Sequence, residues 1–196
     1  HSPYTLSLHD ALPIFPAGVL GLKFHSKINE KLFNPGSVTA ALIVGAIWMI
    51  FAEKRYRGKF TTKDIDNVTI KQAFIIGCFQ CLALWPGMSR SASTIIGAWI
   101  VGLSTVAAAE FSFFLALPVM AGVTYKSLKD INVFALGSMH IVGLTVGFIV
   151  SFIVALIVVD KFITFLKKKP MRVFAVYRIL LGIVLIILSL FNVISM

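Results

Sequence analysis

The sequence predicts an all-α, polytopic integral membrane protein, built from transmembrane helices and one re-entrant helix-turn-helix hairpin. Three observations lead to this fold class. Of the 196 residues, 58% are hydrophobic and only 13% are charged, which is more apolar surface than a soluble domain can bury. The apolar residues form long runs. Lysine and arginine, which give a net charge of +10, gather between these runs, as in loops beside a membrane rather than on a nucleic-acid-binding surface.

Residues 1–14 differ from the rest, and we expect them to be a non-native leader. They are polar, lack periodicity, and lack the basic start and apolar centre of a signal peptide. They look like translated sequencing-adapter sequence. Because no initiator methionine precedes residue 15, we expect the native start to be missing. The membrane domain is then residues 15–196.

The apolar runs define the expected spans in order. Residues 15–24 are interpreted as the end of a helix, followed by a polar connection over 25–37 that closes with an Asn-Pro-Gly turn signal. A span needs about 20 apolar residues. Complete spans are expected at 38–52 (extended by the preceding turn), 107–124, 133–159 and 173–194. Basic loops are expected at 53–71 and 160–172.

Residues 72–85 and 91–103 are two apolar arms on either side of a proline-glycine break. Each arm is too short to cross a bilayer alone. We expect them to enter the membrane and return, with the broken backbone buried in protein or lining a cavity. A re-entrant hairpin also puts both basic loops on one side, which the positive-inside rule assigns to the cytoplasm.

The turn of this hairpin concentrates polar chemistry in an apolar region. Residues 84–94 read Leu-Trp-Pro-Gly-Met-Ser-Arg-Ser-Ala-Ser-Thr. A charge inside the membrane is a functional-site candidate by default, and the planar guanidinium of Arg90 matches phosphate oxygens. Ser89 or Ser91 can cap the second arm, and Thr94 lies one turn further on. This pattern predicts an oxyanion site of the kind that stabilises phosphoryl transfer.

Each of these residues also has a purely structural interpretation. Membrane serines and threonines often bond to helix backbones, and Arg90 has Glu110 as a candidate ion-pair partner. We prefer the functional interpretation for Arg90, Ser89 and Thr94, and leave both open for Ser91, Ser93 and Glu110. Arg178 is interpreted as an interfacial arginine that reaches toward the membrane surface. Cys78 and Cys81 are interpreted as small core residues, because no further metal ligands accompany them.

Residues 74–94, Phe-Ile-Ile-Gly-Cys-Phe-Gln-Cys-Leu-Ala-Leu-Trp-Pro-Gly-Met-Ser-Arg-Ser-Ala-Ser-Thr, resemble the second signature of the bacterial undecaprenyl-diphosphate phosphatase family, also called the bacitracin-resistance family. The segments Glu110-Phe111-Ser112-Phe113 and Tyr177-Arg178 fit as well. The similarity runs from about residue 15 to the C-terminus. The pattern P-G-x-S-R-S-x-x-T in an apolar context is specific.

The resemblance implies an inverted-repeat enzyme of the bacterial plasma membrane, with two re-entrant hairpins at one site. Such an enzyme removes the terminal phosphate of undecaprenyl diphosphate on the outer side and recycles the lipid carrier for peptidoglycan synthesis. By motif, Arg90 binds the diphosphate and Ser89 and Thr94 contact phosphate oxygens. Gly87, Ser91 and Glu110 complete the expected substrate-binding set. The family also implies a divalent cation, Mg or Ca, although the sequence shows no ligand cluster; a homodimer is left open and nucleic acid is not expected.

The sequence departs from the family pattern in one respect. The family's other half-site is a glutamate-rich motif followed by Ser-Ser-Thr-Gly-His, and neither occurs in this chain. Glu30 and Glu53 are not placed to replace it. We therefore expect the domain at 15–196 to lack its N-terminal third and the chain alone to be inactive or nearly so.

Three alternative functions compete with the phosphatase interpretation. The membrane acid-phosphatase superfamily expects a histidine where this chain has Ile96. A transporter or channel for an anionic substrate also uses re-entrant hairpins, and it would move its substrate without consuming it. A non-catalytic partner subunit would receive its carboxylates from another chain.

Overall fold

The computed structural model describes residues 13–130 and 137–192, which are almost entirely helical. The α-helices of these residues are α2 (Ile14–Leu32), α3 (Pro35–Tyr56), α4 (Ile70–Gln80), α5 (Arg90–Ile100), α6 (Thr105–Asp130), α7 (Ser138–Lys168) and α8 (Arg172–Leu190). Two 3-10 helices are η1 (Ile65–Asn67) and η2 (Cys81–Leu84). The described part of the chain contains no β-strand, and the all-α prediction is confirmed. The expected leader lies almost wholly outside the described residues.

Four of the helices are long and apolar enough to cross a membrane. They are Pro35–Tyr56, Thr105–Lys129, Met139–Lys168 and Arg172–Leu190. The apolar side chains of α7 face outward along most of its length, as they do in a helix that contacts lipid. The prediction of a polytopic membrane protein is therefore confirmed.

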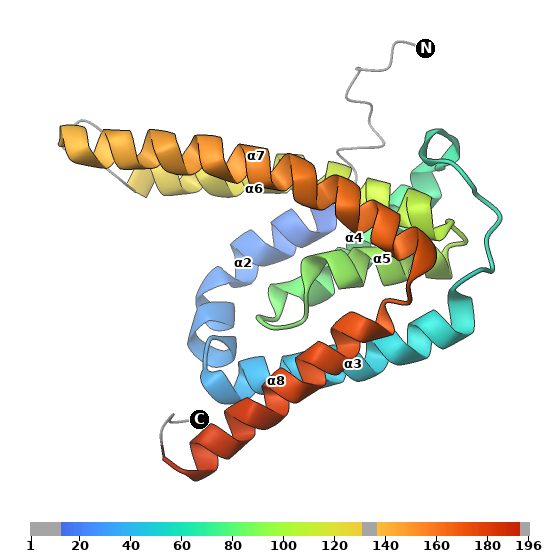
Figure 1. Ribbon diagram of the computed structural model, residues 1–196, viewed down its shortest axis with the longest axis horizontal. Helices are drawn as coiled ribbons and strands as arrows, with labels where there is room; N and C mark the ends of the chain where they lie inside the picture. Colours follow the sequence, from blue (N-terminus) through green and yellow to red (C-terminus); the bar gives the residue numbers. More distant parts are fainter. Residues whose placement is uncertain (1–12, 131–136, 193–196) are drawn as a thin grey trace.

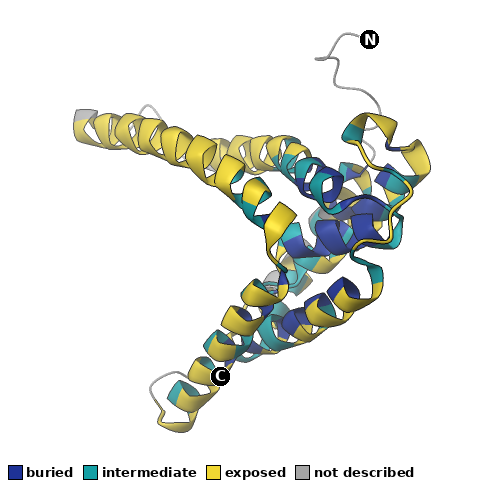
Figure 2. Cartoon of the chain, turned by 45° about the vertical axis from the view of Figure 1, so that its right-hand side comes forward, coloured by how far each residue is buried: buried dark blue, intermediate teal, exposed yellow. Residues whose placement is uncertain are grey.

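The helices are arranged as two diverging pairs with a shorter hairpin between them (Figure 1). One pair is α6 with α7, and the other is α3 with α8. The hairpin of α4 and α5 packs against α6 and α3, with α2 beside it. Buried residues concentrate where the hairpin meets α6 (Figure 2). The largest buried side chain there is that of Trp99 on α5.

Local signals explain where three of these helices begin. The side chain of Asn34 accepts a hydrogen bond from the backbone N–H of Ser37 at 2.8 Å, and a proline follows at the first helical position of α3. Helix α4 begins with a capping box between Thr69 and Gln72. The side chain of Ser89 caps α5, so of the two cap residues that the sequence suggested, Ser89 and Ser91, the first is confirmed.

The two arms of the hairpin run antiparallel and meet at their far ends. The side-chain amide of Gln72, at the start of α4, donates to the carbonyl oxygen of Val101 at 2.9 Å and to the hydroxyl of Thr62 at 3.0 Å. The hairpin therefore begins and ends at the same place, with its turn at the opposite end. This is the geometry that the sequence predicts for the two arms, while their entry into the membrane stays a prediction.

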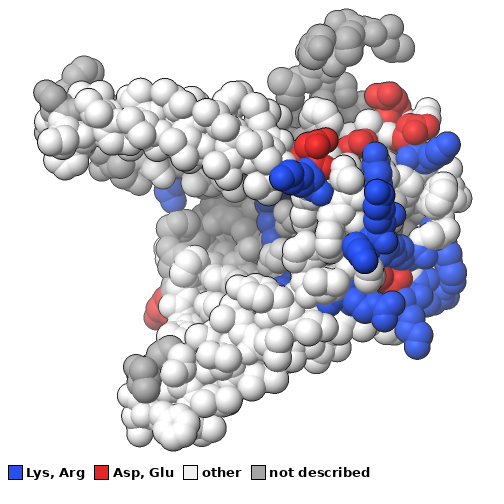
Figure 3. All heavy atoms as spheres, in the orientation of Figure 1, with Lys and Arg blue, Asp and Glu red and all other residues white. Residues whose placement is uncertain are grey.

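The two basic segments also lie at one end of the molecule, where lysine and arginine gather (Figure 3). The guanidinium Nη2 of Arg57 donates to the carbonyl oxygens of Leu166 and Lys169, each at 3.0 Å. Arg57 also pairs with Glu53, whose carboxylate accepts from the backbone N–H groups of the first residues of α8. The two segments therefore lie at the same end of the molecule, and their placement on the cytoplasmic side of a membrane stays a prediction.

Three boundary or burial predictions are wrong. Helix α2 continues to Leu32, so the polar residues after 24 extend the helix rather than connecting it to the next. Helix α7 continues to Lys168, so most of the expected second basic loop is the last two turns of a helix. Long polar side chains such as Lys and Glu are good helix formers, and cations are favourable at a helix C-terminus. Cys78 on α4 is exposed and Cys81 at the start of η2 is half-buried, so neither is a core residue.

Candidate active site at the hairpin turn

The hairpin turn is a tight backbone structure that only certain residues tolerate. Gly87 has a φ of +99°, and a Cβ built there would lie 2.6 Å from the carbonyl oxygen of Val38. Ser89, the cap of α5, also has a positive φ, 71°. The indole N–H of Trp85 donates to the hydroxyl of Ser37 at 2.8 Å and holds the turn against α3. The turn is thus packed closely onto another helix, which fixes the direction of the residues after it.

Arg90 and Thr94 converge on one residue of α6. The Nη1 atom of Arg90 donates to the carbonyl oxygen of Ser112 at 2.9 Å. The hydroxyl of Thr94, which is fully buried, lies 2.7 Å from the hydroxyl of Ser112. Ser112 was not among the expected site residues, although its segment carried part of the family resemblance. Among the described residues, Arg90 forms no ion pair with Glu110, so the structural interpretation of Arg90 as the partner of Glu110 is wrong.

Ser89 and Ser91 line a cavity of about 290 Å³ beside the turn. Its other walls are largely apolar and come from α3, α5, α7 and α8. The residues that line it are Met49, Ser89, Ser91, Ala92, Ile95, Phe162, Met171, Phe174, Tyr177 and Arg178. A lining that combines serine hydroxyls and a guanidinium with aromatic and aliphatic side chains suits a ligand with an anionic head and an apolar chain.

Arg178 is buried, with 6% of its surface exposed, so its interpretation as an interfacial arginine is wrong. Its Nη2 atom donates to the carbonyl oxygen of Gly87 in the turn and, at 3.3 Å, to that of Ala41 on α3. The position of Arg178 near the start of an apolar run suggested a side chain that extends to the membrane surface. The criterion that singled out Arg90, a charge inside an apolar segment, would have found Arg178 too.

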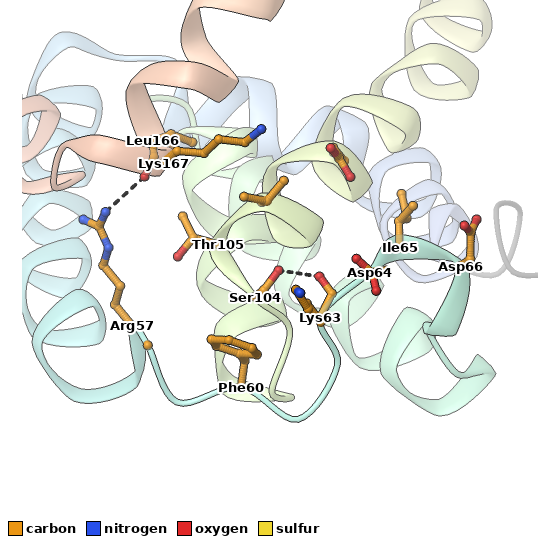
Figure 4. Close-up of a pocket in the computed structure, with 13 residues that line it drawn as sticks. Arg57, Phe60, Lys63, Asp64, Ile65, Asp66, Ser104, Thr105, Leu166 and Lys167 are labelled. Carbon is orange, nitrogen blue, oxygen red and sulfur yellow. Dashed lines mark hydrogen bonds between the residues drawn. The ribbon is translucent and has the colours of Figure 1, made fainter.

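Glu110 is not brought together with the serines and arginines of the turn. It lines a second cavity, of about 640 Å³, at the basic end of the molecule (Figure 4). Arg57, Lys63, Asp64 and Lys167 line the same cavity. The hydroxyl of Ser104 donates to the carbonyl oxygen of Lys63 there at 2.7 Å. The structure therefore separates the expected site residues into three groups. Gly87, Ser89 and Ser91 lie at the turn, whereas Arg90 and Thr94 contact Ser112 of α6. Glu110 lines the separate cavity at the basic end.

The described residues do not fit a metal ion held by protein side chains alone. Within residues 13–130 and 137–192, no three His, Cys, Asp or Glu side chains lie close enough together to hold one. No step of the chemistry is therefore assigned to a resident metal.

The fold and the turn define a class: a polytopic membrane protein with a helical hairpin whose turn carries serine hydroxyls and an arginine. Residues 3–184 match the family model described as Bacitracin resistance protein BacA. This chain belongs to that family, as the resemblance at the turn indicated.

Curated relatives agree with the family. The chain is 94% identical over 195 residues to the "Undecaprenyl-diphosphatase" of Clostridium novyi (strain NT), covering 100% of this chain and 68% of that protein. It is 64% identical over 180 residues to the "Undecaprenyl-diphosphatase 2" of Clostridium acetobutylicum, covering 92% of this chain and 58% of the relative. It is 50% identical over 175 residues to the "Undecaprenyl-diphosphatase" of Ruminiclostridium cellulolyticum, covering 88% of this chain and 62% of the relative.

Proposed function

We propose that this chain carries the hairpin half-site of an undecaprenyl-diphosphate phosphatase, which hydrolyses undecaprenyl diphosphate to undecaprenyl phosphate and phosphate. The observation that carries the proposal is the 94% identity to a protein of that name, with the P-G-x-S-R-S-x-x-T turn present and ordered. The reaction recycles the lipid carrier for peptidoglycan and cell-wall synthesis. By removing the diphosphate form of the lipid, it also confers resistance to bacitracin.

The cavity beside the turn suits such a substrate. Ser89 and Ser91 offer hydroxyl donors to the diphosphate, and the apolar walls, which include Phe162 and Phe174, accept the first part of the polyprenyl chain. Three of the helices that line the cavity, α3, α7 and α8, are long and apolar enough to cross a membrane, so a lipid tail that leaves the cavity between them stays in hydrocarbon. A lipid substrate and the bilayer are thus the partners that this site supports.

In this proposal Arg90 contacts the diphosphate and stabilises the charge that develops as the terminal phosphoryl group is transferred. A guanidinium carries five N–H donors, and the contact with the Ser112 carbonyl uses one of them while fixing the orientation of the side chain. Ser89 binds a phosphate oxygen from the N-terminal end of α5, where the helix dipole favours an anion. Thr94, which is fully buried, supports the position of Arg90 through Ser112.

Two further parts of the proposal concern a cation and the assembly. Mg or Ca would accompany the diphosphate and be held largely by its oxygens and by water, an arrangement common for Mg, since the described side chains form no ligand cluster. The proposal also leaves room for a homodimer. Size-exclusion chromatography with light scattering in detergent tests it.

Phosphate release from undecaprenyl diphosphate in detergent tests the function. We would assay this chain beside the whole Clostridium novyi relative, and introduce Arg90→Ala into this chain and the matching change into the relative. The proposal is supported if the relative releases phosphate and the arginine change abolishes that release. Phosphate release by this chain alone would overturn the expectation that the chain is inactive. If neither protein releases phosphate, vesicle flux of the lipid or another anion tests the transporter alternative.

A further inference from the structure

The guanidinium of Arg178 is buried and carries a positive charge that no side chain of the described residues neutralises. The ion pair on the neighbouring helix, between Arg57 and Glu53, does not include Arg178, whose hydrogen bonds within the described residues go to backbone carbonyl oxygens. The Nη1 atom of Arg178 is also buried without a hydrogen-bond partner. A buried charge and a buried unpaired donor are both unfavourable, and such a group in a native protein calls for a ligand, an ion or water.

The rest of the side chain is held in place firmly. Its Nη2 atom donates to the carbonyl oxygens of Gly87 and Ala41. Opposite it on α3 is Gly45, where an added Cβ would lie 2.6 Å from Nη2. The absence of a side chain at Gly45 therefore makes room for the guanidinium between α3, α8 and the turn. A guanidinium fixed in this way is ready to bind an anion without first losing rotational freedom.

The same arginine lines the cavity beside the turn together with Ser89, Ser91 and Tyr177. Hydroxyls and a guanidinium are the donors that proteins use for phosphate oxygens. A contact between α8 and the turn, taken alone, explains Nη2 but leaves Nη1 and the net charge unexplained. A bound anion explains both.

We propose that Arg178 is a second substrate-binding arginine, whose guanidinium donates to an oxygen of the diphosphate held at Ser89 and Ser91. The identity of the ligand as a diphosphate rests on the proposed function, whereas the anion site itself rests on the unpaired Nη1 and the cavity. Arg178 and Arg90 then supply one positive charge each on α8 and α5, which matches a ligand with more than one negative charge.

Binding of inorganic pyrophosphate to the purified chain in detergent tests this inference, measured by calorimetry. Arg178→Met removes the charge and keeps the length of the side chain, and Arg172→Met is the matched control because Arg172 is exposed near the start of the same helix. We expect the Arg178→Met variant to bind pyrophosphate about 10- to 100-fold more weakly, the range for losing a hydrogen bond to a charged group. The control should bind as the unchanged chain does.

A conservative variant separates binding from folding. Arg178→Lys keeps the charge but loses the planar fork, so we expect affinity about three- to tenfold below that of the unchanged chain. If Arg178→Met fails to fold, as judged by circular dichroism and gel filtration, the lysine variant decides. Unchanged pyrophosphate affinity in any folded Arg178 variant overturns the inference, and so does the absence of pyrophosphate binding in the unchanged chain.

Turnover of undecaprenyl diphosphate, measured in the whole Clostridium novyi relative, distinguishes this inference from the proposed function. A matching arginine change that raises KM for the lipid more than it lowers kcat supports both. If pyrophosphate binding depends on Arg178 but no phosphate is released by any protein, the anion site stands and the proposed function fails. If the arginine variant turns over with unchanged KM, the function stands and the inference fails.

Discussion

The hydroxyl of Thr94 lies 2.7 Å from the hydroxyl of Ser112, and both side chains are buried. The carbonyl oxygen of Ser112 accepts the hydrogen bond from Arg90 on the same helix as Thr94. One residue of α6 therefore orients two polar residues of α5, one through its side chain and the other through its backbone. A mutation of the Ser112 side chain therefore affects the contact with Thr94 and leaves the backbone contact with Arg90 in place.

Replacing Ser112 by alanine should remove the contact with Thr94 and keep the contact with Arg90, which uses the backbone. We expect a loss of about 1 kcal/mol in the free energy of unfolding, measured by thermal unfolding in detergent. Phosphate release should fall by only about threefold to tenfold, because a hydrogen bond of this size corresponds to that range. Thr145→Val is the control, since Thr145 is exposed and bonds only within α7. A loss of activity as large as that of Arg90→Ala would show that the Ser112 hydroxyl acts directly.

Arg90→Lys and Arg90→Ala should lower phosphate release in the whole relative by about 10²- to 10³-fold, measured as kcat. A lysine keeps the charge but cannot present a planar pair of donors, so it should recover only part of the loss. Arg55→Lys is the matched control, because Arg55 is exposed on α3. Near-normal kcat with Arg90→Lys would mean that the charge alone matters and not the geometry of the fork.

Gly87→Ala should disrupt the hairpin turn. The backbone there has a φ of +99°, and the new methyl group would meet the carbonyl oxygen of Val38 and the Cβ of Ala41. We expect a destabilisation of about 1–3 kcal/mol, measured by thermal unfolding, with loss of pyrophosphate binding. Gly143→Ala should have no such effect, because Gly143 lies in a helix with open space around it. An equal shift in both variants would argue against a strained turn.

Glu53→Gln should weaken the attachment of α8 to α3. The carboxylate is buried, pairs with Arg57 at 2.6 Å, and accepts from the backbone N–H groups of Met171 and Arg172 at 2.7 and 2.9 Å. An amide lacks the charge and replaces one acceptor oxygen by a donor, so we expect a loss of about 2–3 kcal/mol in thermal unfolding. Glu30→Gln, on the exposed side of α2, should leave stability unchanged.

Cysteine labelling should place both ends of the hairpin on one side of the membrane. In a variant without the native cysteines, cysteine at Phe60 and at Lys169 should react with an impermeant maleimide from the cytoplasmic side only. Cysteine at Gly36, near the turn end, should not react from that side. Both labelling sites flank the basic end, where Arg57 joins the two segments. Reaction of Phe60 and Lys169 from opposite sides would mean that the hairpin is a single span.

The sequence by itself determined the membrane class, the apolar spans and the position of the hairpin turn. The apolar composition and the length of the apolar runs decide whether a chain belongs in water or in a membrane, and neither depends on how the helices pack. The cap at Ser89 and the break before it followed from local backbone preferences. Helix ends were predicted less well, because charged side chains that mark a loop in one place extend a helix in another, as at Lys168.

Only the tertiary structure decided which charged residues meet. Arg178 is 91 residues from Gly87 in the chain, yet its guanidinium donates to the carbonyl oxygen of that turn. Glu110 is close in sequence to Ser112, yet it lines a cavity at the basic end while Ser112 contacts Arg90. Residues two apart on a helix point to different sides, and contacts between distant helices depend on how their faces pack. Such contacts leave no periodic signal in the sequence, so the partners of Arg90 and Arg178 were visible only in the folded chain.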